Sequence, residues 1–234
     1  MRIFAVECSA LASSVAIVEQ DKLLCEFFTN TGLTHSQTLM PMAQSALTCA
    51  GIELNSIDCF AIASGPGSFT GVRIGIAALK GIAIAQEKPC MPVSALEALA
   101  YNFLFKNCIA CCVMDARCNQ VYTATFRCTD TVQRLTADEA LMIDELKYKL
   151  QNYDLPVVFV GDGANLCYNA LKDELCGVKL APLPLRYQRA SSVAFCAMDK
   201  LKTQDAVSVE NLLPVYLRVP QAERELKKRM ESKK

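Results

Sequence analysis

The stretch SGPGSFTGVRIG, residues 64–75, lies between two apolar runs, IDCFAIAS at 57–64 and VRIGIAALKGIAIAQ at 72–86. This order predicts a buried strand, a glycine turn and a helix. A helix that starts behind such a turn can bind an anion, because its first N–H groups have no partner inside the helix. The loop lacks the Gly-Lys-Ser/Thr of a P-loop, and its G-x-G-x-x-x-G spacing is one residue longer than the dinucleotide motif. The residues leave two interpretations open: an anion site, or a turn that only reverses the chain.

The composition is that of a globular protein with balanced charge. The chain has 234 residues, 52% hydrophobic and 21% charged, which is enough for one large domain or two small ones. Lys plus Arg equals Asp plus Glu at 24 each, which argues against a protein that binds nucleic acid mainly through its net charge. We find no signal-peptide pattern and no run of about 20 uncharged apolar residues. We therefore expect a cytoplasmic protein.

Thirteen cysteines are scattered through apolar runs such as DCFAIAS and CIACCVMD rather than spaced through loops. This pattern is typical of free, buried thiols in a reducing compartment. Cys108 and Cys111 form a C-x-x-C, but zinc would need a second ligand pair, and a redox motif would open a helix. In a strand, residues three apart point to opposite faces. We predict that these cysteines are buried thiols.

Hydrophobic periodicity and turn residues divide the first half of the chain into strands and helices. They predict strands at 2–7, 14–19, 23–28 and 57–64, helices at 35–50 and 72–86, and a third helix within 91–105. Gly51 ends the first helix, and Pro41 either kinks it or moves its start to near Leu39. Ser94 and Glu97 form a capping box at the start of the third helix.

The pattern restarts at Cys108, which indicates a duplicated unit. CIACCVMDARCNQVYTATF has the layout of IFAVECSALASSVAIV, with Asp115 where the first copy has Glu7, and LPVVFVGDGA at 155–164 resembles FAIASGPG. Each half reads as an antiparallel meander followed by a parallel strand and helices. We predict an α/β protein with a first lobe at 1–105 and a second lobe at 106–219. The tail at 220–234 is too charged to pack and is expected to fray.

Two strand-end acids and one histidine are the candidate chemical groups. Glu7 and Asp115 could hold a metal–phosphate from opposite sides of a cleft, or they could be solvated strand ends. His35 is the only histidine and position 39 is Leu, so no H-x-x-x-H metal motif is present. A His-based triad would have to use His35 itself, and no G-x-S-x-G motif occurs. We expect His35 to lie near a helix N-terminus and to bond locally.

The helix predicted at 72–86 is apolar around most of its circumference. Over 72–85 its only charges, Arg73 and Lys80, are seven apart and therefore share one stripe. The glycines at 71 and 75 and the small residues at 77, 81 and 85 would allow another helix to approach closely. With 14 residues and two cations, 72–85 is too short and too charged to span a bilayer. It could be an internal core helix or a subunit interface.

Taken together, these segments resemble the bacterial tRNA threonylcarbamoyladenosine biosynthesis protein TsaB (YeaZ) family over nearly the whole chain. The resemblance rests on THSQTLMPM, SGPGSFTGVRIGIAALKGIA, VSALEALA, MDARCNQVY, VGDGA and PVYLR. It implies a duplicated, two-lobe actin-like (ribonuclease H-like) fold with mixed sheets, shared with sugar kinases and heat-shock ATPases. The superfamily commonly ends its first strand in Asp followed by Thr or Ser, whereas this chain has Glu7-Cys8. That departure argues against independent ATP hydrolysis.

The resemblance also implies a function. Members of the family support transfer of a threonylcarbamoyl group to the adenosine beside the tRNA anticodon, as a non-catalytic partner of the catalytic paralogue TsaD together with the ATPase TsaE. The isolated chain is expected to carry no cofactor or metal, ATP being used by the assembled complex, and to contact tRNA only through that complex. The alternatives are a stand-alone ATP-dependent phosphotransferase or a peptidase of the same superfamily.

The resemblance assigns two groups of residues. The helices beside the glycine loop form the pairing surface for a homodimer and for TsaD, and the loop mainly orients the second of them. The expected interface residues are Leu39, Ala43, Ala46, Leu47, Ala50, Arg73, Gly75, Ala78, Leu79 and Ile82. The expected vestigial nucleotide or phosphate contacts are Glu7, Ser64, Gly65, Gly67, Asp115, Gly161 and Gly163.

Overall fold

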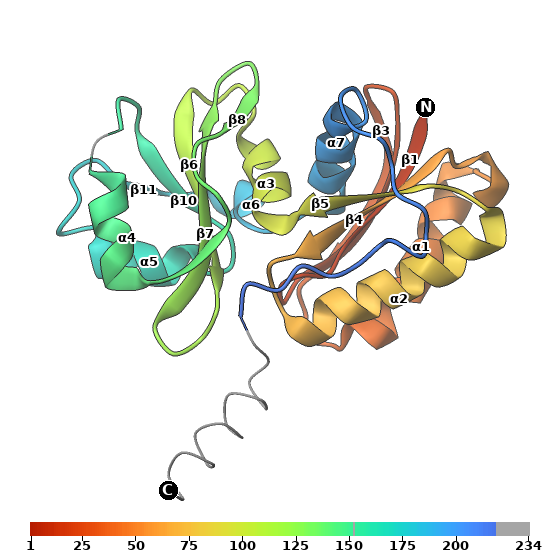
Figure 1. Cartoon of the computed structure of the whole chain (residues 1–234), viewed down its shortest axis with the longest axis horizontal. Coiled ribbons are helices and arrows are strands. Elements are labelled where there is room, and N and C mark those ends of the chain that lie inside the picture. The colour runs from red at the N-terminus through yellow and green to blue at the C-terminus, as the bar shows by residue number, and fades with distance from the viewer. Residues whose placement is uncertain (152, 219–234) are drawn as a thin grey trace, which may run out of the picture.

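The computed structural model describes residues 1–151 and 153–218. The predicted frayed tail, 220–234, lies outside these residues. Within them the chain forms two lobes, each built on one mixed sheet (Figure 1).

The sheet of the first lobe has the strand order β3-β2-β1-β4-β5. Its strands are β1 (Arg2–Glu7), β2 (Ser13–Glu19), β3 (Lys22–Thr29), β4 (Cys59–Gly65) and β5 (Cys90–Ser94). The first three strands form an antiparallel meander, whereas β4 runs parallel to β1, and β5 runs parallel to β4. The strands predicted at 2–7, 14–19, 23–28 and 57–64 are confirmed to within two residues at each end.

The second sheet repeats this arrangement. Its strands are β6 (Cys108–Asp115), β7 (Gln120–Cys128), β8 (Val132–Arg134), β9 (Glu139–Met142), β10 (Val157–Val160) and β11 (Lys179–Leu180). β6 is antiparallel to β7 and parallel to β10, as β1 is antiparallel to β2 and parallel to β4. β8 and β9 both pair with β7, and β11 pairs with β10. The predicted duplication is therefore confirmed in the topology.

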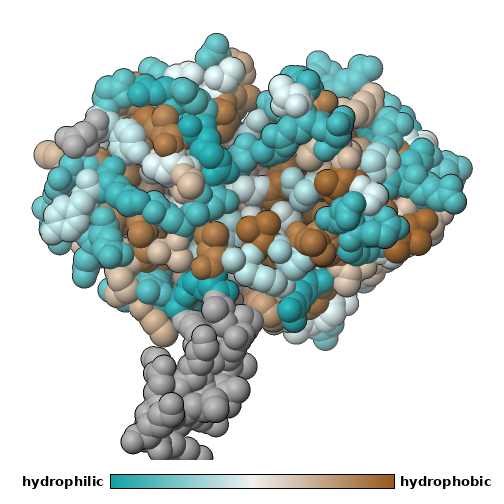
Figure 2. Space-filling model, in the orientation of Figure 1, coloured by the Kyte–Doolittle hydropathy of each residue, from teal (hydrophilic) through white to brown (hydrophobic). Residues whose placement is uncertain are grey.

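Helices cover both faces of each sheet. They are α1 (His35–Ala50), α2 (Phe69–Gln86), α3 (Ala95–Ala100), α4 (Ile143–Leu150), α5 (Ala164–Leu171), α6 (Leu183–Arg186) and α7 (Ala190–Lys200), with 3₁₀ helices at Leu54–Ser56 and Tyr101–Phe103. α1 and α2 lie outside the first sheet, α4 and α5 outside the second, and α3 and α7 between the two sheets (Figure 1). On the face shown in Figure 2, hydrophobic residues reach the surface of both lobes among larger areas of hydrophilic residues.

β1 shows why this layering forms. Successive side chains of a strand point to opposite faces, and β1 is apolar at every inner position. Ile3 and Ala5 face the core between the lobes, whereas Phe4 and Val6 face the core under α1 and α2. Both sheets contribute to the inner core, so the two lobes share one hydrophobic interior.

Local signals set the helix ends. Gly51 follows α1 with φ +65°, a left-handed C-cap that glycine adopts without strain. Pro41 lies inside α1, which nevertheless begins at His35, so the suggested start near Leu39 is wrong. α2 begins at Phe69, three residues before the predicted start, because Ser68 caps it by accepting a hydrogen bond from Gly71 N (3.2 Å).

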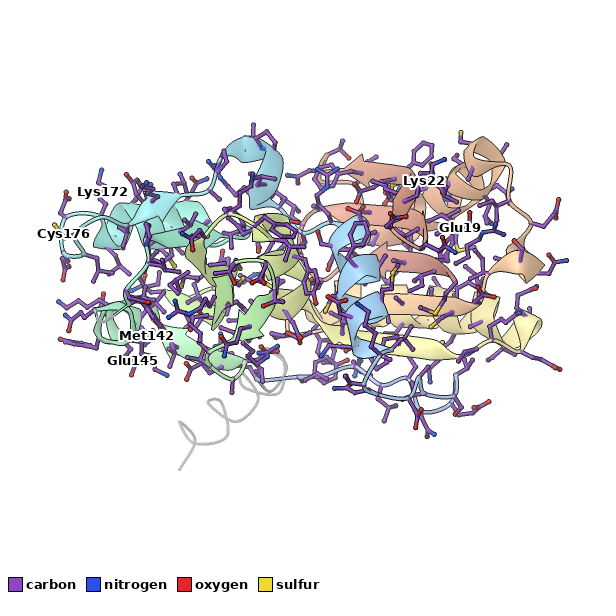
Figure 3. The ribbon with its side chains drawn as sticks, turned by 90° about the horizontal axis from the view of Figure 1, so that it is seen from above. Glu19, Lys22, Met142, Glu145, Lys172 and Cys176 are labelled. Carbon is purple, nitrogen blue, oxygen red and sulfur yellow. The ribbon has the colours of Figure 1, made fainter. Side chains whose placement is uncertain are left out.

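The remaining helices follow the same logic. Ser94 Oγ accepts from Glu97 N at 3.2 Å and starts α3, as predicted for the N-cap. The Glu97 carboxylate pairs with Arg134 and Lys200, so only the first half of the predicted capping box is present. At α4, Met142 N donates to Glu145 Oε2 at 2.9 Å, and both residues are labelled in Figure 3. The same view places the β2–β3 turn, marked by Glu19 and Lys22, at one end of the molecule and Cys176 at the other.

The chain returns to the first lobe at its end. α7 packs on β1, β2 and β4 of the first sheet, although residues 190–200 fall in the sequence range predicted as the second lobe. Cys90 and Val207 exchange two backbone hydrogen bonds, which extends the first sheet's β5 edge with late sequence. Chain order and spatial packing therefore differ after α6.

All thirteen cysteines are free thiols in the structure. Cys108 and Cys111 lie on β6 and belong to different cores, Cys108 to the inner one and Cys111 to the one under α4 and α5. The prediction of buried thiols at this C-x-x-C is confirmed, because both side chains are buried and face opposite sides of the sheet.

Candidate functional site

The glycine loop packs directly on the turn between β1 and β2. A Cβ added at Gly67 would lie 2.2 Å from Ser9 O, so only glycine permits this approach. Ser68 N donates to the same Ser9 O at 2.6 Å. The predicted strand–turn–helix at 64–75 is confirmed, and its turn is closed by the chain itself.

Several donors of this loop are used within the chain. Ser68 N bonds Ser9 O, and Gly71 N bonds Ser68 Oγ at 3.2 Å. Gly71 also lies against β1's end, where an added Cβ would be 2.2 Å from Cys8 O. Ser64 Oγ donates to Val93 O at 3.3 Å, and Ser64 O accepts from Val215 N at 2.8 Å. All of these hydrogen bonds and close contacts are made within the chain. They favour a turn that only reverses the chain over an anion-binding site.

Glu7 is buried at the end of β1, with 1% of its surface exposed. Its Oε1 accepts from Ser9 N at 2.6 Å. Burial raises the pKa of Glu7 to about 7, and the nearby Asp162 adds to the rise, while hydrogen bonding from Ser9 offsets part of it. Glu7 is thus a buried acid rather than a solvated strand end.

Asp162, in the turn after β10 of the second lobe, lies near Glu7. Its Oδ1 accepts from Gln188 Nε2 at 2.8 Å, and burial raises its pKa. Asp115 lies at the end of β6, is exposed, and accepts from Arg117 N at 2.7 Å. Asp162 interacts electrostatically with both Glu7 and Asp115, which places it near the two acids that the sequence singled out. Sequence reasoning identified Glu7 and Asp115 but not Asp162, although it lies in the VGDGA turn.

The glycines of that second turn hold it against β6. Gly161 has φ +115°, and an added Cβ would lie 2.1 Å from Val113 O. Gly163 N donates to Val113 O at 3.2 Å. Gly65, at φ +122°, holds a corresponding close approach in the first lobe, where an added Cβ would lie 2.3 Å from Val215 O. These glycines serve close backbone packing at the cleft.

His35 is the first residue of α1 and lies beside Gly71, as expected for a position near a helix N-terminus. Its Nε2 hydrogen-bonds Ala10 O at 2.8 Å, so its partner is 25 residues away and not local in sequence. Leu39, on the inner side of α1, is buried with 2% of its surface exposed. Across residues 1–151 and 153–218, no group of three His, Cys, Asp or Glu side chains is placed to hold a metal ion.

The structure divides the residues of the expected pairing surface into buried and exposed ones. Half of the ten residues assigned to it are buried inside this chain: Leu39, Ala43, Ala46, Gly75 and Leu79. An added Cβ at Gly75 would lie 2.1 Å from Cys8 Sγ and 3.2 Å from Ile62 Cδ1, so Gly75 serves contact with the sheet. These five residues pack inside this chain, and their assignment to a partner interface stays a prediction. Leu47, Ala50, Ala78 and Ile82 are partly buried and Arg73 is exposed.

The outward face of α2 carries a different set of small residues. Ala77, Gly81 and Ala85 recur every four positions and are exposed, and Ile84 beside them is 59% exposed. An added Cβ at Gly81 would meet nothing within 4 Å. α1 lies alongside α2 and adds Met40, 49% exposed. We call Met40, Ala77, Gly81, Ile84 and Ala85 the outer helix face.

By length and composition alone, α2 could cross a membrane, since its 18 residues have a mean hydropathy of 1.2. The premise that this helix is too short is therefore wrong. Its inner side packs on the first sheet through Val72, Ile76 and Ala83, as in the core helix of a globular protein. Its apolar character follows from having an inner face against the sheet and the outer helix face opposite.

The segment 207–218, which we call the strap, runs along α2 toward the second lobe (Figure 1). Arg73 Nε donates to Tyr216 Oη at 2.7 Å, and its guanidinium lies 3.8 Å from the centre of the Phe69 ring. Lys80 Nζ donates to Glu210 O at 3.1 Å. Arg218 then donates to Ala116 O at 2.7 Å, in the second lobe. The stripe of two cations noted in the sequence therefore holds the strap.

Comparisons with known proteins agree with this architecture. The sequence matches the family described as TsaD: tRNA N6-adenosine threonylcarbamoyltransferase over residues 29–226. It is 31% identical to the tRNA threonylcarbamoyladenosine biosynthesis protein TsaB of Bacillus subtilis (95% of this chain, 96% of that protein). It is 32% identical to the protein of the same name from Escherichia coli (93% and 95%).

Solved structures show the same relationship. A Pseudomonas aeruginosa protein described as similar to the peptidase YeaZ has a TM-score of 0.80 at 26% identity, covering 93% of this chain and 99% of that one. A ROK hexokinase from Thermus thermophilus, at 11% identity and a TM-score of 0.50 over 87% of this chain and all of the other, shares the fold alone.

Proposed function

Because this chain belongs to the TsaB family of tRNA threonylcarbamoyladenosine biosynthesis proteins, within the wider TsaD family, we propose that it is a non-catalytic partner in that modification. In this proposal it binds the catalytic paralogue TsaD, works with the ATPase TsaE, and meets tRNA through the assembled complex. ATP is then used by the complex in the cytoplasm, not by the isolated chain. The outer helix face, defined above, mediates both its binding to TsaD and its self-association.

The observation that carries the proposal is the outer helix face. An exposed glycine in a helix interior costs roughly 0.5–1 kcal/mol relative to alanine. Gly81 nevertheless occupies such a position, with open space around an added Cβ. Ala77, Ile84 and Ala85 keep the surroundings small or apolar, which suits close packing against another helix. A partner helix explains this surface better than solvent does.

The region between the lobes supports a non-catalytic role. Ser68 N is bonded to Ser9 O, and Glu7 is buried with a raised pKa. A phosphoryl-transfer site needs donors and carboxylates free to meet phosphate and metal. Here Ser68 N and the Glu7 carboxylate are instead bonded to Ser9, in the turn between β1 and β2.

Reconstitution tests the proposed role. TsaD, TsaE, substrate tRNA, ATP, threonine and bicarbonate are combined with and without this chain, and threonylcarbamoyladenosine is measured by mass spectrometry of digested tRNA. We expect modification to depend on the chain. Equal modification in its absence would overturn the proposal. So would ATP hydrolysis by the purified chain at about 1 per second that Glu7→Ala abolishes.

The surface is tested with Gly81→Leu. The side chain points away from this chain, so the monomer should stay folded. Overpacking a close helix contact costs about 1–3 kcal/mol, which corresponds to roughly 5- to 150-fold weaker association. The matched control is Ala170→Leu, an exposed position of α5 in the second lobe.

Sedimentation of the free chain and titration with TsaD are run on both variants. Gly81→Leu should weaken both associations, and Ala170→Leu neither. Loss of one association with the other unchanged would show that the two use different surfaces.

A further inference from the structure

A second candidate binding surface lies on the other lobe. Its centre is an open hollow of about 290 Å³ whose floor includes Phe103, Cys108, Val158 and Leu185. The first three are buried core residues, so the floor is rigid and apolar. No residue of α1 or α2 lines it, and it is therefore separate from the outer helix face.

The rim of this hollow is positively charged. Lys106 and Lys179 line it, and both residues are exposed. Neither forms an ion pair with any residue in the described part of the chain. No Asp or Glu lines the hollow, so its charge is left uncompensated.

Large apolar side chains extend the surface beyond the hollow. Phe105, next to Lys106 in the chain, is 74% exposed, and Leu183, in α6 beside the lining residue Pro182, is 63% exposed. Phe105 is held at φ +61°, where few non-glycine residues occur, and its N–H donates to Thr129 O at 2.6 Å. A backbone hydrogen bond thus holds the loop in a conformation that leaves the Phe105 side chain exposed. A large apolar side chain exposed in this way favours binding.

We propose that this surface, Lys106, Lys179, Phe105, Leu183 and the hollow between them, docks an acidic segment of a partner protein that inserts an apolar side chain. The hollow suits one such anchor, and the flanking apolar residues give a contact area wider than a small ligand would use. Charge complementarity selects the acidic partner. The chain's own residues 219–234 carry six Lys or Arg against three Glu, the same sign as the rim, which argues against that segment as the occupant.

The placement of the outer helix face and of the surface around the hollow indicates an adaptor role. With one surface on each lobe, the chain can hold two proteins at once, as an adaptor does. This inference uses residues of the hollow and its rim, none of which lies in α1 or α2, and it does not depend on the identity of the protein bound at those two helices.

Peptide selection supplies the test. Random 12-residue peptides displayed on phage are selected against the full chain and then against Lys106→Glu/Lys179→Glu. We expect enriched peptides to combine Asp or Glu with one or two bulky apolar residues. A labelled synthetic copy should bind the wild-type chain at least about tenfold more tightly than the double variant, a difference of about 1.4 kcal/mol.

Two further variants control the result. Lys22→Glu/Lys172→Glu makes the same change in net charge at exposed lysines labelled at opposite ends of Figure 3, and it should bind the peptide as the wild type does. Phe105→Ala/Leu183→Ala removes only exposed side chains and should weaken binding without changing the melting temperature.

Three outcomes would overturn the proposal. One is the absence of peptides that distinguish the wild type from Lys106→Glu/Lys179→Glu. Another is equal binding of the peptide by Lys106→Glu/Lys179→Glu and by the charge-matched control, Lys22→Glu/Lys172→Glu. The last is a change in the sedimentation of Lys106→Glu/Lys179→Glu measured without peptide, which would assign the surface to a second copy of this chain.

Discussion

Two glycines of α2, six positions apart, have opposite surroundings. Gly75 lies against Cys8 and Ile62, whereas Gly81 faces open space. We expect Gly75→Ala to lower the free energy of unfolding by about 1–3 kcal/mol through overpacking. Gly81→Ala should raise it by about 0.5–1 kcal/mol, because alanine is the better helix former. Urea unfolding measures both, and a stable Gly75→Ala protein would contradict the inward placement of that residue.

Glu7 should make stability depend on pH. Its pKa is 4.5 in the unfolded chain and about 7 in the folded protein. Between these values the folded state binds the proton more tightly, so the free energy of unfolding falls as pH rises from about 4.5 to about 7 and levels off above. The loss is on the order of 3 kcal/mol, since each pKa unit is worth about 1.4 kcal/mol.

Glu7→Gln tests this linkage because it keeps the acceptor for Ser9 N and removes the titration. Denaturation is measured on both proteins at about pH 5 and about pH 8. We expect the variant to lose much of the wild type's decrease between the two pH values. The same slope in both proteins would mean that another group is responsible.

The roles of individual residues were harder to predict from the sequence than the elements or the topology. The stripe of small residues in α2 is visible in the sequence, but periodicity cannot tell which small residue faces the sheet without knowing where β1 lies. Gly75 and Gly81 both belong to the pattern that would allow a helix to approach, and only Gly75 was named as an interface residue, whereas the structure buries Gly75 against the sheet and leaves Gly81 exposed. Asp162 was missed because only the folded chain brings it near Glu7.

At the scale of elements, the strap should open as a unit when its anchor is removed. Tyr216 packs on Phe69 with ring centres 4.7 Å apart and accepts from Arg73. We expect Tyr216→Ala to speed hydrogen exchange at Val215 N, which bonds Ser64 O, by about tenfold. Tyr216→Phe keeps the ring and should show a smaller increase. Exchange in β1 serves as the internal reference, and an equal increase there would indicate global rather than local opening.

Regular elements were predictable because their signals are local. Gly51 and Ser94 mark the helix ends where the sequence placed them. The start of α2 was missed by three residues because Ser68, and not the last glycine of the turn, caps the helix. The strap has no periodicity, and its contacts join residues as far apart as Arg73 and Tyr216, so a local pattern could not reveal it.

At the scale of the whole molecule, thiol reactivity should follow burial. Cys49, Cys118 and Cys176 are exposed, Cys25 is half-buried, and the other nine cysteines are buried. Burial raises the pKa of Cys59 and Cys167 to about 12, which suppresses the reactive thiolate. Iodoacetamide should therefore label the three exposed thiols first in the native protein. Intact mass in denaturant should show thirteen adducts, and fewer would reveal a bridge or a bound metal.

The duplicated topology was accessible from sequence because each half repeats the same order of apolar runs, with Glu7 and Asp115 at matching strand ends. The return of the chain was not. α7 and the strap follow the second lobe in sequence but pack on the first, and an apolar helix carries no mark of which sheet it will cover.

That return sets the order in which the protein can be completed during synthesis. The five strands of the first sheet leave the ribosome before the second lobe, yet the fully buried Leu212, and α7, which covers the sheet's inner face, emerge only after that lobe. Until they emerge, the first lobe holds exposed apolar surface, a state prone to aggregation. The lobe that is translated first is therefore completed after the second lobe, because the inner face of its sheet stays uncovered until α7 emerges.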